Sequence, residues 1–396
     1  MSQYEPSRRP VCSILEDALE GRRISAGEAR TLLLDGDLIE LGMAADVVRD
    51  RHNDSGIASY NIDRNINYTN VCVYKCRFCA FYREPGDAEG YLLPLEEIGG
   101  KVEETLALNG TGILMQGGVH PDLPLSYYED LLRYLRERYP ECHLHAFSPP
   151  EVQFLARKER MSVFDVIARL KAAGLMSIPG GGAEVLSDAI RRDVLAHPKC
   201  SAEEWIDVMR QAHRNGLRTS ATMMYGMGED LAARVEHFQR VRDLQDETGG
   251  FTAFISWTFQ QRHTDLEQEA IPIVHAEEYL RTLAVSRLFI DNIAHFQTSW
   301  VTQGKKIGQA GLRFGADDMG SIMIEENVVA AAGTSYRMSQ EEMEHLIAAA
   351  GYEPRQRNNL YERWVTPEDT AAAALRYRSS LTPVNLELAT RLPVVA

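Results

Sequence analysis

Cysteine and long apolar runs are scarce in this 396-residue sequence, and both absences exclude whole classes of protein. Six cysteines in so long a chain do not form the disulfide framework of a secreted scaffold, so we expect reduced thiols that bind metal, catalyse or fill the core. No stretch supplies the roughly 18 uninterrupted apolar residues of a membrane-spanning helix. Residues 1–11 also lack the apolar run of a signal peptide. The sequence therefore predicts a cytoplasmic protein without a membrane span.

Positive charge is also in short supply. The chain has 42 Lys and Arg against 57 Asp and Glu, which gives a net charge of −15 with histidine neutral. A surface that binds phosphates without sequence preference would work against this overall field. We therefore expect no nucleic-acid partner, although the ordinary share of apolar residues, 44%, predicts a sizeable folded core.

Strand-like and helix-like patterns alternate over most of the chain. The predicted strands cover residues 65–71, 112–116, 143–147, 176–179, 217–224, 251–258, 293–299 and 312–317. Between them lie helices with start signals such as Ser162 with Asp165 and Ser201 with Glu204, which have the spacing of a capping box. Eight strand–helix units favour an α/β fold, a parallel (βα)8 TIM-type barrel whose working end is the carboxyl mouth of its strands.

The ends of the chain are predicted to be helical. Residues 1–60 contain three amphipathic helices, at 14–20, 26–35 and 38–52, and would form an N-terminal cap on a barrel spanning residues 61–324. Residues 325–396 carry another capping box, Ser339 with Glu342, and we expect a C-terminal helical extension packed on the barrel.

Three of the cysteines, Cys72, Cys76 and Cys79, fall within eight residues after the first predicted strand. At this cysteine frequency a CxxxCxxC match is expected by chance about 0.001 times in the chain. Three thiolates can hold three corners of a [4Fe-4S] cluster and leave its fourth iron open for chemistry. A zinc site completed by Asp87 or a distant histidine, or a ferredoxin-like electron carrier, are the alternatives, but both require a fourth ligand.

The cysteine motif, with Phe78 before its third cysteine, resembles the signature of the radical S-adenosylmethionine (SAM) enzymes. The resemblance implies a [4Fe-4S] cluster and SAM as cofactors, with SAM bound to the open iron and cleaved to a 5′-deoxyadenosyl radical. It assigns Cys72, Cys76 and Cys79 to the cluster. For SAM it implies a set of contacts made by Phe78, Gln116, Gly117, Gly118, Ser148, Glu184 and Lys199, with Arg192 as an alternative to Lys199.

Longer stretches are similar to the cyclic dehypoxanthinyl futalosine synthases of menaquinone biosynthesis. They are NINYTNVC (65–72), CRFCAFYR (76–83), HAFSPPE (145–151), SIPGGGAE (177–184), QDETGGFTAF (245–254) and RQRNNLY (355–361). The sequence departs from the family pattern at Gln261 and His263, where that pattern has Pro and Asn. Related radical enzymes, aminofutalosine synthase and the deazaflavin-forming enzymes, share the cysteine motif and the barrel and remain alternatives.

This resemblance implies an oxidative cyclisation. The radical would take the C4′ hydrogen of the sugar in dehypoxanthine futalosine, the sugar carbon would bond to the benzoate ring, and loss of one electron and one proton would restore aromaticity. Candidates for the base that takes the proton are four side chains at predicted strand ends: His145, Glu151, Asp291 and His295. The substrate carboxylate requires an arginine, for which Arg218 and Arg313 are candidates.

The cluster also needs an external source of electrons. Lys75, Arg77 and Arg83 place positive charge beside the cysteines, which suggests a docking patch for an acidic donor such as flavodoxin or ferredoxin. The same residues would also suit an ordinary solvated loop.

Overall fold

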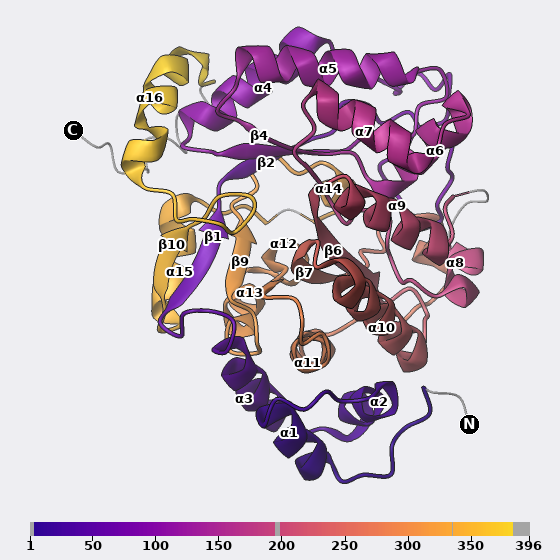
Figure 1. Cartoon of the computed structure of the whole chain (residues 1–396), viewed down its shortest axis with the longest axis vertical. Helices are drawn as coiled ribbons and strands as arrows, with labels where there is room; N and C mark the ends of the chain where they lie inside the picture. The colour runs from indigo at the N-terminus through magenta and orange to yellow at the C-terminus, as the bar shows by residue number, and fades with distance from the viewer. Residues whose placement is uncertain (1–3, 195–198, 335, 383–396) are drawn as a thin grey trace.

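The computed structural model describes residues 4–194, 199–334 and 336–382 and is built around one parallel sheet. The sheet curls into a barrel with helices around it, and the N-terminal helices form a separate layer at one end (Figure 1). Its neighbouring strands follow the order β10-β1-β9-β8-β7-β6-β5-β4-β3-β2. The strands are β1 Ile57–Asn61, β2 Asp63–Ile66, β3 Gly112–Met115, β4 His143–Ala146, β5 Ser177–Ile178, β6 Arg218–Tyr225, β7 Phe251–Thr258, β8 His295–Gln297, β9 Asp318–Ser321 and β10 Glu353–Gln356.

The barrel closes because its first strand bends and changes partners. Only Ile62 separates β1, which pairs with β9 and β10, from β2, which pairs with β3. The segment after β9 continues the closure, since Ile324 N donates to Asp63 O at 3.1 Å and Asn65 N donates to Glu325 O at 3.2 Å. Counted as one bent strand, β1 and β2 complete the predicted (βα)8 TIM-type barrel, and β10 is an additional strand outside it.

Three predicted segments differ from the structure. The first strand, predicted over residues 65–71, is instead formed by β1 and β2 between Ile57 and Ile66. Residues 312–317 form a turn after helix α13, with Gly315 at φ +94°, and the strand begins only at Asp318. Leu312 and Ala316 gave an apolar signal there because both side chains are buried, not because they lie on a strand. The C-terminal segment was expected to be helical but includes β10, whose polar sequence adopts extended backbone by pairing with β1.

Helices cover the outside of the barrel and both ends of the chain. They are α1 Val11–Leu19, α2 Ala26–Asp35, α3 Leu38–Arg49, α4 Leu95–Ala107, α5 Leu125–Arg138, α6 Pro149–Glu159, α7 Val163–Ala173, α8 Asp188–Val194, α9 Ala202–Arg214, α10 Leu231–Thr248, α11 Ala276–Phe289, α12 Trp300–Gln303, α13 Lys305–Gly311, α14 Val328–Ala331, α15 Gln340–Ala349 and α16 Pro367–Tyr377. Short 3-10 turns lie at Asp265–Gln268 and Arg378–Ser380. The predicted N-caps are present, since Ser162, Ser201 and Ser339 each accept from the backbone amide three residues later.

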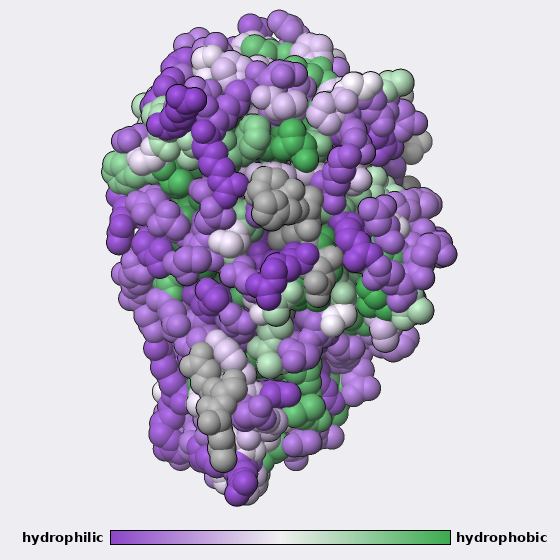
Figure 2. Space-filling view, turned by 90° about the vertical axis from the view of Figure 1, so that its right-hand side faces the viewer, coloured by the Kyte–Doolittle hydropathy of each residue, from purple (hydrophilic) through white to green (hydrophobic). Residues whose placement is uncertain are grey.

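The N-terminal helices pack on each other and on the barrel helices, and the C-terminal helix α16 packs on the barrel at another place. Helices α2 and α3 contact α10 and α11, while α16 contacts α4 on the opposite side. The division at residues 60 and 324 remains a prediction. The structure adds that Glu325 continues the barrel wall beside Asn65, and that β10 extends the sheet outside the barrel by pairing with β1. None of the helices in the described ranges is long and apolar enough to cross a membrane, and the face in Figure 2 is mainly hydrophilic, with small separate apolar groups.

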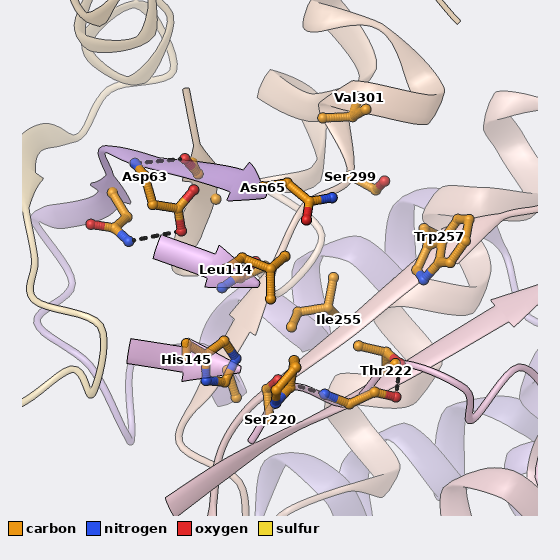
Figure 3. A pocket seen from close by; sticks show the side chains of 18 of the residues that line it. Asp63, Asn65, Leu114, His145, Ser220, Thr222, Ile255, Trp257, Ser299 and Val301 are labelled. Atoms are coloured by element: carbon orange, nitrogen blue, oxygen red, sulfur yellow. Dashed lines mark hydrogen bonds between the residues drawn. The ribbon is translucent and has the colours of Figure 1, made fainter. Parts of the chain in front are cut away.

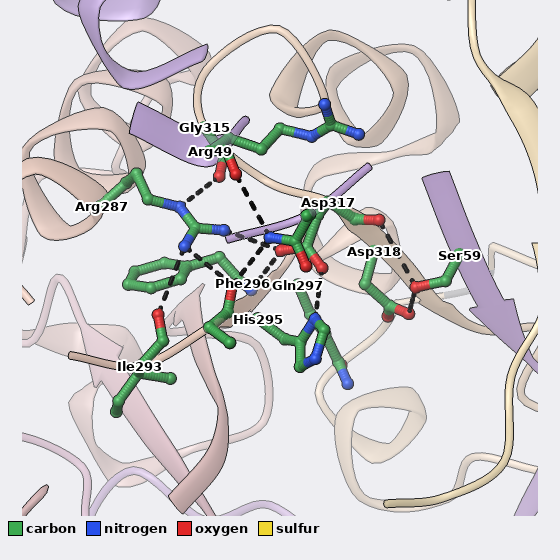
Figure 4. Close-up of polar contacts among 12 residues, drawn as sticks. Arg49, Ser59, Arg287, Ile293, His295, Phe296, Gln297, Gly315, Asp317 and Asp318 are labelled. Carbon is green, nitrogen blue, oxygen red and sulfur yellow. Dashed lines mark hydrogen bonds and ion pairs between the residues drawn. The ribbon is translucent and has the colours of Figure 1, made fainter. Parts of the chain in front are cut away.

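Buried charge ties β8 and β9 to helix α11 at the amino end of the barrel (Figure 4). Arg287 donates to Asp317 at 2.7 Å and lies over the ring of Phe296, with its carbon Cζ 3.9 Å from the ring centroid. Burial lowers the pKa of Arg287 to about 10. Asp317 also accepts from the amide of Phe296 and pairs with His295, each at 2.7 Å. This carboxylate therefore balances the arginine and holds the two strands together.

We predict that Asp317→Ala destabilises the fold by about 3–5 kcal/mol, because it leaves Arg287 buried without a counter-charge. Urea unfolding followed by circular dichroism measures this loss. The matched control is Asp291→Ala, since Asp291 pairs with the half-exposed Arg23, which keeps Asp246 as a partner. That variant should lose less than about 1 kcal/mol; equal losses in the two variants would contradict the assignment.

Candidate active site

A cavity of about 310 Å³ runs along the barrel interior from its carboxyl mouth to its floor. At the mouth it is lined by Phe78, Gln116, Glu184 and the glycines of the loop after β5. Apolar side chains form part of its wall, including Leu114, Ile255 and Trp257. Figure 3 shows Leu114 on β3, between the polar residues of β2 and β4, and Trp257 across the cavity from Asp63. The cavity is thus an apolar pocket with polar groups at fixed positions, which is the usual form of a small-molecule site.

The cysteine segment follows β2 directly and lies at this mouth. Cys72 and Cys76 are buried, and Cys79 is partly buried. The loop is fixed by backbone bonds at 2.9 Å from Cys72 N to Arg83 O and from Val73 N to Val119 O. The strand and the loop after β3 therefore position the three thiols that the sequence singled out.

The Gln116-Gly117-Gly118 segment allows the loops after β2 and β3 to approach closely. A Cβ on Gly118 would lie 2.3 Å from the carbonyl oxygen of Val71, and a Cβ on Gly117 would lie 2.5 Å from the Tyr68 ring. Gly118 also donates its amide to Thr69 O at 2.8 Å. Both glycines pack against the chain that leads into the cysteines, and of the three residues only Gln116 lines the cavity.

Lys199 and Glu184 form a buried ion pair at the mouth. Lys199 Nζ donates to Glu184 Oε1 at 2.9 Å and lies 5.0 Å from the centroid of the Phe78 ring. Burial alone would lower the pKa of Lys199, but the neighbouring Cys76 and Glu184 raise it overall. Arg191 is buried too and donates to Cys200 O at 2.7 Å, 3.4 Å from Glu184 Oε2. Arg191 was not selected from the sequence. Arg192, which was the alternative to Lys199, is exposed.

His145 lies inside the barrel and lines the cavity. Its Nδ1 is 2.6 Å from the hydroxyl of Ser177, which is also 2.7 Å from Nε2 of His143. Burial lowers the pKa of His145 to about 3 and that of His143 to about 4, so both rings are neutral at pH 7. His145 is the one member of the four predicted bases that lines this cavity.

Ser148 and Glu151 are buried below the mouth and take part in a helix cap. Glu151 accepts from the Ser148 amide at 2.7 Å, from Tyr68 at 2.6 Å and from the Gly117 amide at 3.2 Å. Burial raises the pKa of Glu151. Neither residue lines the cavity, so both support the loops around it from behind.

Asp291 and His295 do not reach the cavity, which corrects their selection as candidate bases. Asp291 precedes β8 and pairs with Arg23 at 2.7 Å on the surface. His295 is the first residue of β8 and therefore lies at the amino end of the barrel. It lines a second cavity of about 540 Å³, and its ring stacks on Tyr361 with centroids 4.1 Å apart. Both predictions failed because they took the start of a strand for its end.

Arginines at the cavity also differ from expectation. Arg313 is exposed and bonds to Ala350 O, while Arg218 is exposed at the start of β6, where it lines the cavity rim and donates to Gly249 O. The buried arginine of the cavity is Arg357, in the segment after β10, where it pairs with Asp318. The stretch RQRNNLY (355–361) could have pointed to Arg357, but this stretch lies outside the predicted barrel and its arginines were not considered as cavity residues.

The first strand supplies further cavity residues that were missed. Asn61, Asp63 and Asn65 all line the cavity. Their spacing of two residues could have identified them, because alternate residues of a strand share one face. The segment was predicted to start only at residue 65, so the first half of this pattern was not assigned to a strand.

Comparisons with known proteins place the chain in a family. Residues 66–241 match the family model "Radical SAM superfamily", and residues 248–370 match "CofH/MqnC C-terminal region". The chain is 46% identical to the cyclic dehypoxanthine futalosine synthase of Halalkalibacterium halodurans over 92% of this chain and 97% of the relative. The chain belongs to this family of radical SAM enzymes.

Two further comparisons agree with this membership. The cyclic dehypoxanthine futalosine synthase of Streptomyces coelicolor is 45% identical over 90% of each chain. Among solved structures, the FeFe-hydrogenase maturase HydG from Carboxydothermus hydrogenoformans superposes with a TM-score of 0.71, covering 96% of this chain and 87% of that one, at 15% identity. That similarity supports the TIM-type fold of the radical SAM class.

The cofactors of this family are a [4Fe-4S] cluster and SAM, and the residues at the mouth fit them. Thiolates are the usual ligands of iron–sulfur clusters, and three of them lie on one buried loop beside the cavity. Within the described residues, no three His, Cys, Asp or Glu side chains are arranged to hold a single metal ion. A four-iron cluster holds its thiolates farther apart than one ion does, so this finding does not bear on the cluster.

We predict that Gly118→Ala separates the β3 loop from the cysteine loop, because the new methyl group would collide with the Val71 carbonyl. The expected result is a loss of about 1–3 kcal/mol in stability and less iron and sulfide bound per chain after anaerobic reconstitution. Gly100→Ala is the control, since no heavy atom lies within 4 Å of its added Cβ in helix α4. Unchanged iron content in Gly118→Ala would show that the close approach does not position the thiols.

Proposed function

We propose that this protein is a radical SAM cyclase that converts dehypoxanthine futalosine to cyclic dehypoxanthinyl futalosine in menaquinone biosynthesis. The observation that carries the proposal is the identity of 46% over nearly the whole length of a relative with that name, together with a cysteine loop at the mouth of the barrel cavity. An aminofutalosine synthase or deazaflavin-forming activity is the second candidate, because those enzymes share the motif and the barrel.

In this proposal Cys72, Cys76 and Cys79 hold the cluster. Phe78, Gln116, Glu184 and Lys199 are proposed contacts of SAM, supported by the way the first three line the mouth and Lys199 joins Glu184 to the cysteine loop. When bound, the two cofactors supply the electron and the carbon radical that removes a hydrogen atom from the substrate. Gly117, Gly118 and Ser148 contribute by holding the loops in place rather than by side-chain contact.

The chain itself orients the substrate and excludes water. The apolar wall of Leu114, Ile255 and Trp257 offers a surface for an aromatic ring and leaves little room for solvent. His145 is the proposed acceptor for the proton that the ring loses, because its neutral imidazole faces the cavity and Ser177 fixes its orientation. Glu151, buried behind the mouth, is better suited to support the loop of Gly117.

The proposal includes a cytoplasmic location and an acidic electron donor such as flavodoxin or ferredoxin. Cluster thiols must be reduced, which favours a reducing compartment. The three basic residues of the cysteine segment form ion pairs with neighbouring carboxylates: Lys75 with Glu84, Arg77 with Glu269 and Arg83 with Glu89. A donor would have to compete with these carboxylates.

We predict that the reconstituted protein, given dithionite, SAM and dehypoxanthine futalosine, forms 5′-deoxyadenosine and a product two hydrogens lighter than the substrate. Mass spectrometry measures both. Cys72→Ser, Cys76→Ser and Cys79→Ser should each abolish both products, whereas Cys12→Ser should leave them unchanged, because Cys12 is exposed and outside the cysteine loop. Formation of deoxyadenosine without the lighter product would indicate that the protein has one of the related activities instead. Absence of both from the wild type would contradict the proposal.

If Lys75, Arg77 and Arg83 form a docking surface, their combined replacement by Ala should lower activity with a protein donor more than activity with dithionite. The measurement is the rate of product formation with each reductant. A control replaces three exposed arginines on distant helices, Arg133, Arg214 and Arg376, by Ala. Equal loss with both reductants would contradict docking.

A further inference from the structure

Three polar residues of the bent first strand form one wall of the cavity. Asn61, Asp63 and Asn65 alternate along the strand and all line the cavity, and Figure 3 shows Asp63 and Asn65 on the side opposite Trp257. We call these residues the first-strand wall. Asparagine amides both donate and accept hydrogen bonds, whereas a carboxylate only accepts.

Asp63 has an unused acceptor in this wall. Its Oδ2 accepts from Asn61 Nδ2 at 3.2 Å, but its Oδ1 is buried and has no hydrogen-bond partner among the residues that the structure describes. Burial raises the pKa of Asp63. A buried polar atom left unpaired costs about 1–3 kcal/mol of stability. Stability of the fold therefore does not explain the unpaired Oδ1 of Asp63.

Closure of the barrel does not require the Asp63 side chain. The backbone makes those contacts, since Asp63 N donates to the Ser321 hydroxyl at 3.2 Å and Asp63 O accepts from Ile324 N at 3.1 Å. Any residue with extended backbone would form the second of these bonds. Oδ1 of this carboxylate is therefore available to a ligand.

The charge around Asp63 indicates which ligand groups would bind there. Arg357 is held by Asp318, with Nε to Oδ2 at 2.5 Å and Nη2 to Oδ1 at 3.1 Å. Two carboxylates and one guanidinium thus share this part of the barrel floor, which disfavours a carboxylate on the ligand. Hydroxyl groups are favoured because they donate to a carboxylate and carry no charge of their own.

We propose that the first-strand wall is the hydroxyl-binding subsite of the cavity, in which Asp63 accepts a hydrogen bond from a sugar hydroxyl of the substrate. This inference rests on the proposed function, since it takes the ribose-derived part of dehypoxanthine futalosine as the ligand. Asn61 holds the carboxylate in place, and Asn65 offers a donor and an acceptor two residues nearer the mouth.

The test measures affinity without turnover. The reconstituted enzyme, not reduced, is titrated by calorimetry with dehypoxanthine futalosine and with analogues that each lack one sugar hydroxyl. We expect one analogue to bind the wild type about 10- to 100-fold more weakly than the substrate, the range for a hydrogen bond to a charged group. In Asp63→Ala that difference should fall below about threefold, and Asp63→Asn should restore part of it.

The stability of the variants is a second measurement, because a purely structural role of Asp63 predicts a different result. Asp63→Ala removes an incompletely paired buried carboxylate, so its urea midpoint should equal or exceed that of the wild type. Asn65→Ser tests the wall at another position and should also reduce discrimination between hydroxyl analogues. Asp130→Asn, an exposed residue paired with Arg133, is the control and should change nothing.

Each outcome decides the inference. If Asp63→Ala weakens all ligands equally, or weakens none, Asp63 does not contact a hydroxyl and the inference is wrong while the proposed function stands. If Asp63→Ala unfolds at lower urea and Asn65→Ser keeps full discrimination, the wall is structural and the inference is overturned. If the wild type binds no dehypoxanthine futalosine, the proposed function fails first, and the subsite fails with it.

Discussion

The architecture depends on one strand that changes partners at Ile62. Its first half pairs with β9 and β10, and its second half pairs with β3, so a single bend closes the sheet into a barrel. The cysteine loop is the direct continuation of this strand. The same ten residues therefore close the barrel, line its cavity and carry the chain to the position of the metal cluster.

Buried charge is distributed so that each buried arginine near the barrel has an acidic or carbonyl partner. Arg287 has Asp317, Arg357 has Asp318, and Arg191 has the carbonyl groups of the loop that carries Glu184. In this protein of net charge −15, the positive charge of each of these buried guanidinium groups is compensated by its own partner. The cavity lining combines amides and hydroxyls with the ionisable side chains of Asp63, His145, Glu184, Arg218, Glu326 and Arg357. Of these, Glu184 and Arg357 already have an oppositely charged partner.

Sequence reasoning predicted what depends on local pattern. Strand β7 was predicted with its observed ends, and the cysteine loop was found because three thiols at that spacing rarely occur by chance. What it missed depends on long-range pairing. Strand β10 has no apolar alternation and exists because β1 offers it hydrogen bonds. His295 was misplaced because the pattern predicted a strand over residues 293–299 and did not show that the strand begins at His295. Arg357 and Asp63 are almost 300 positions apart in the sequence, so no local pattern could show that they lie at the same cavity.

The floor of the cavity is made by the last part of the barrel to be synthesised. Arg357 and Tyr361 line both the main cavity and the cavity beneath it, so their side chains form the partition between the two. Synthesis proceeds from the N-terminus, and the cysteine loop leaves the ribosome some 280 residues before this partition does. Until then the barrel is open to water from below. A cavity closed at its floor is thus a property of the finished chain, and a nascent chain that already carries all three thiols lacks this protection for a reactive radical.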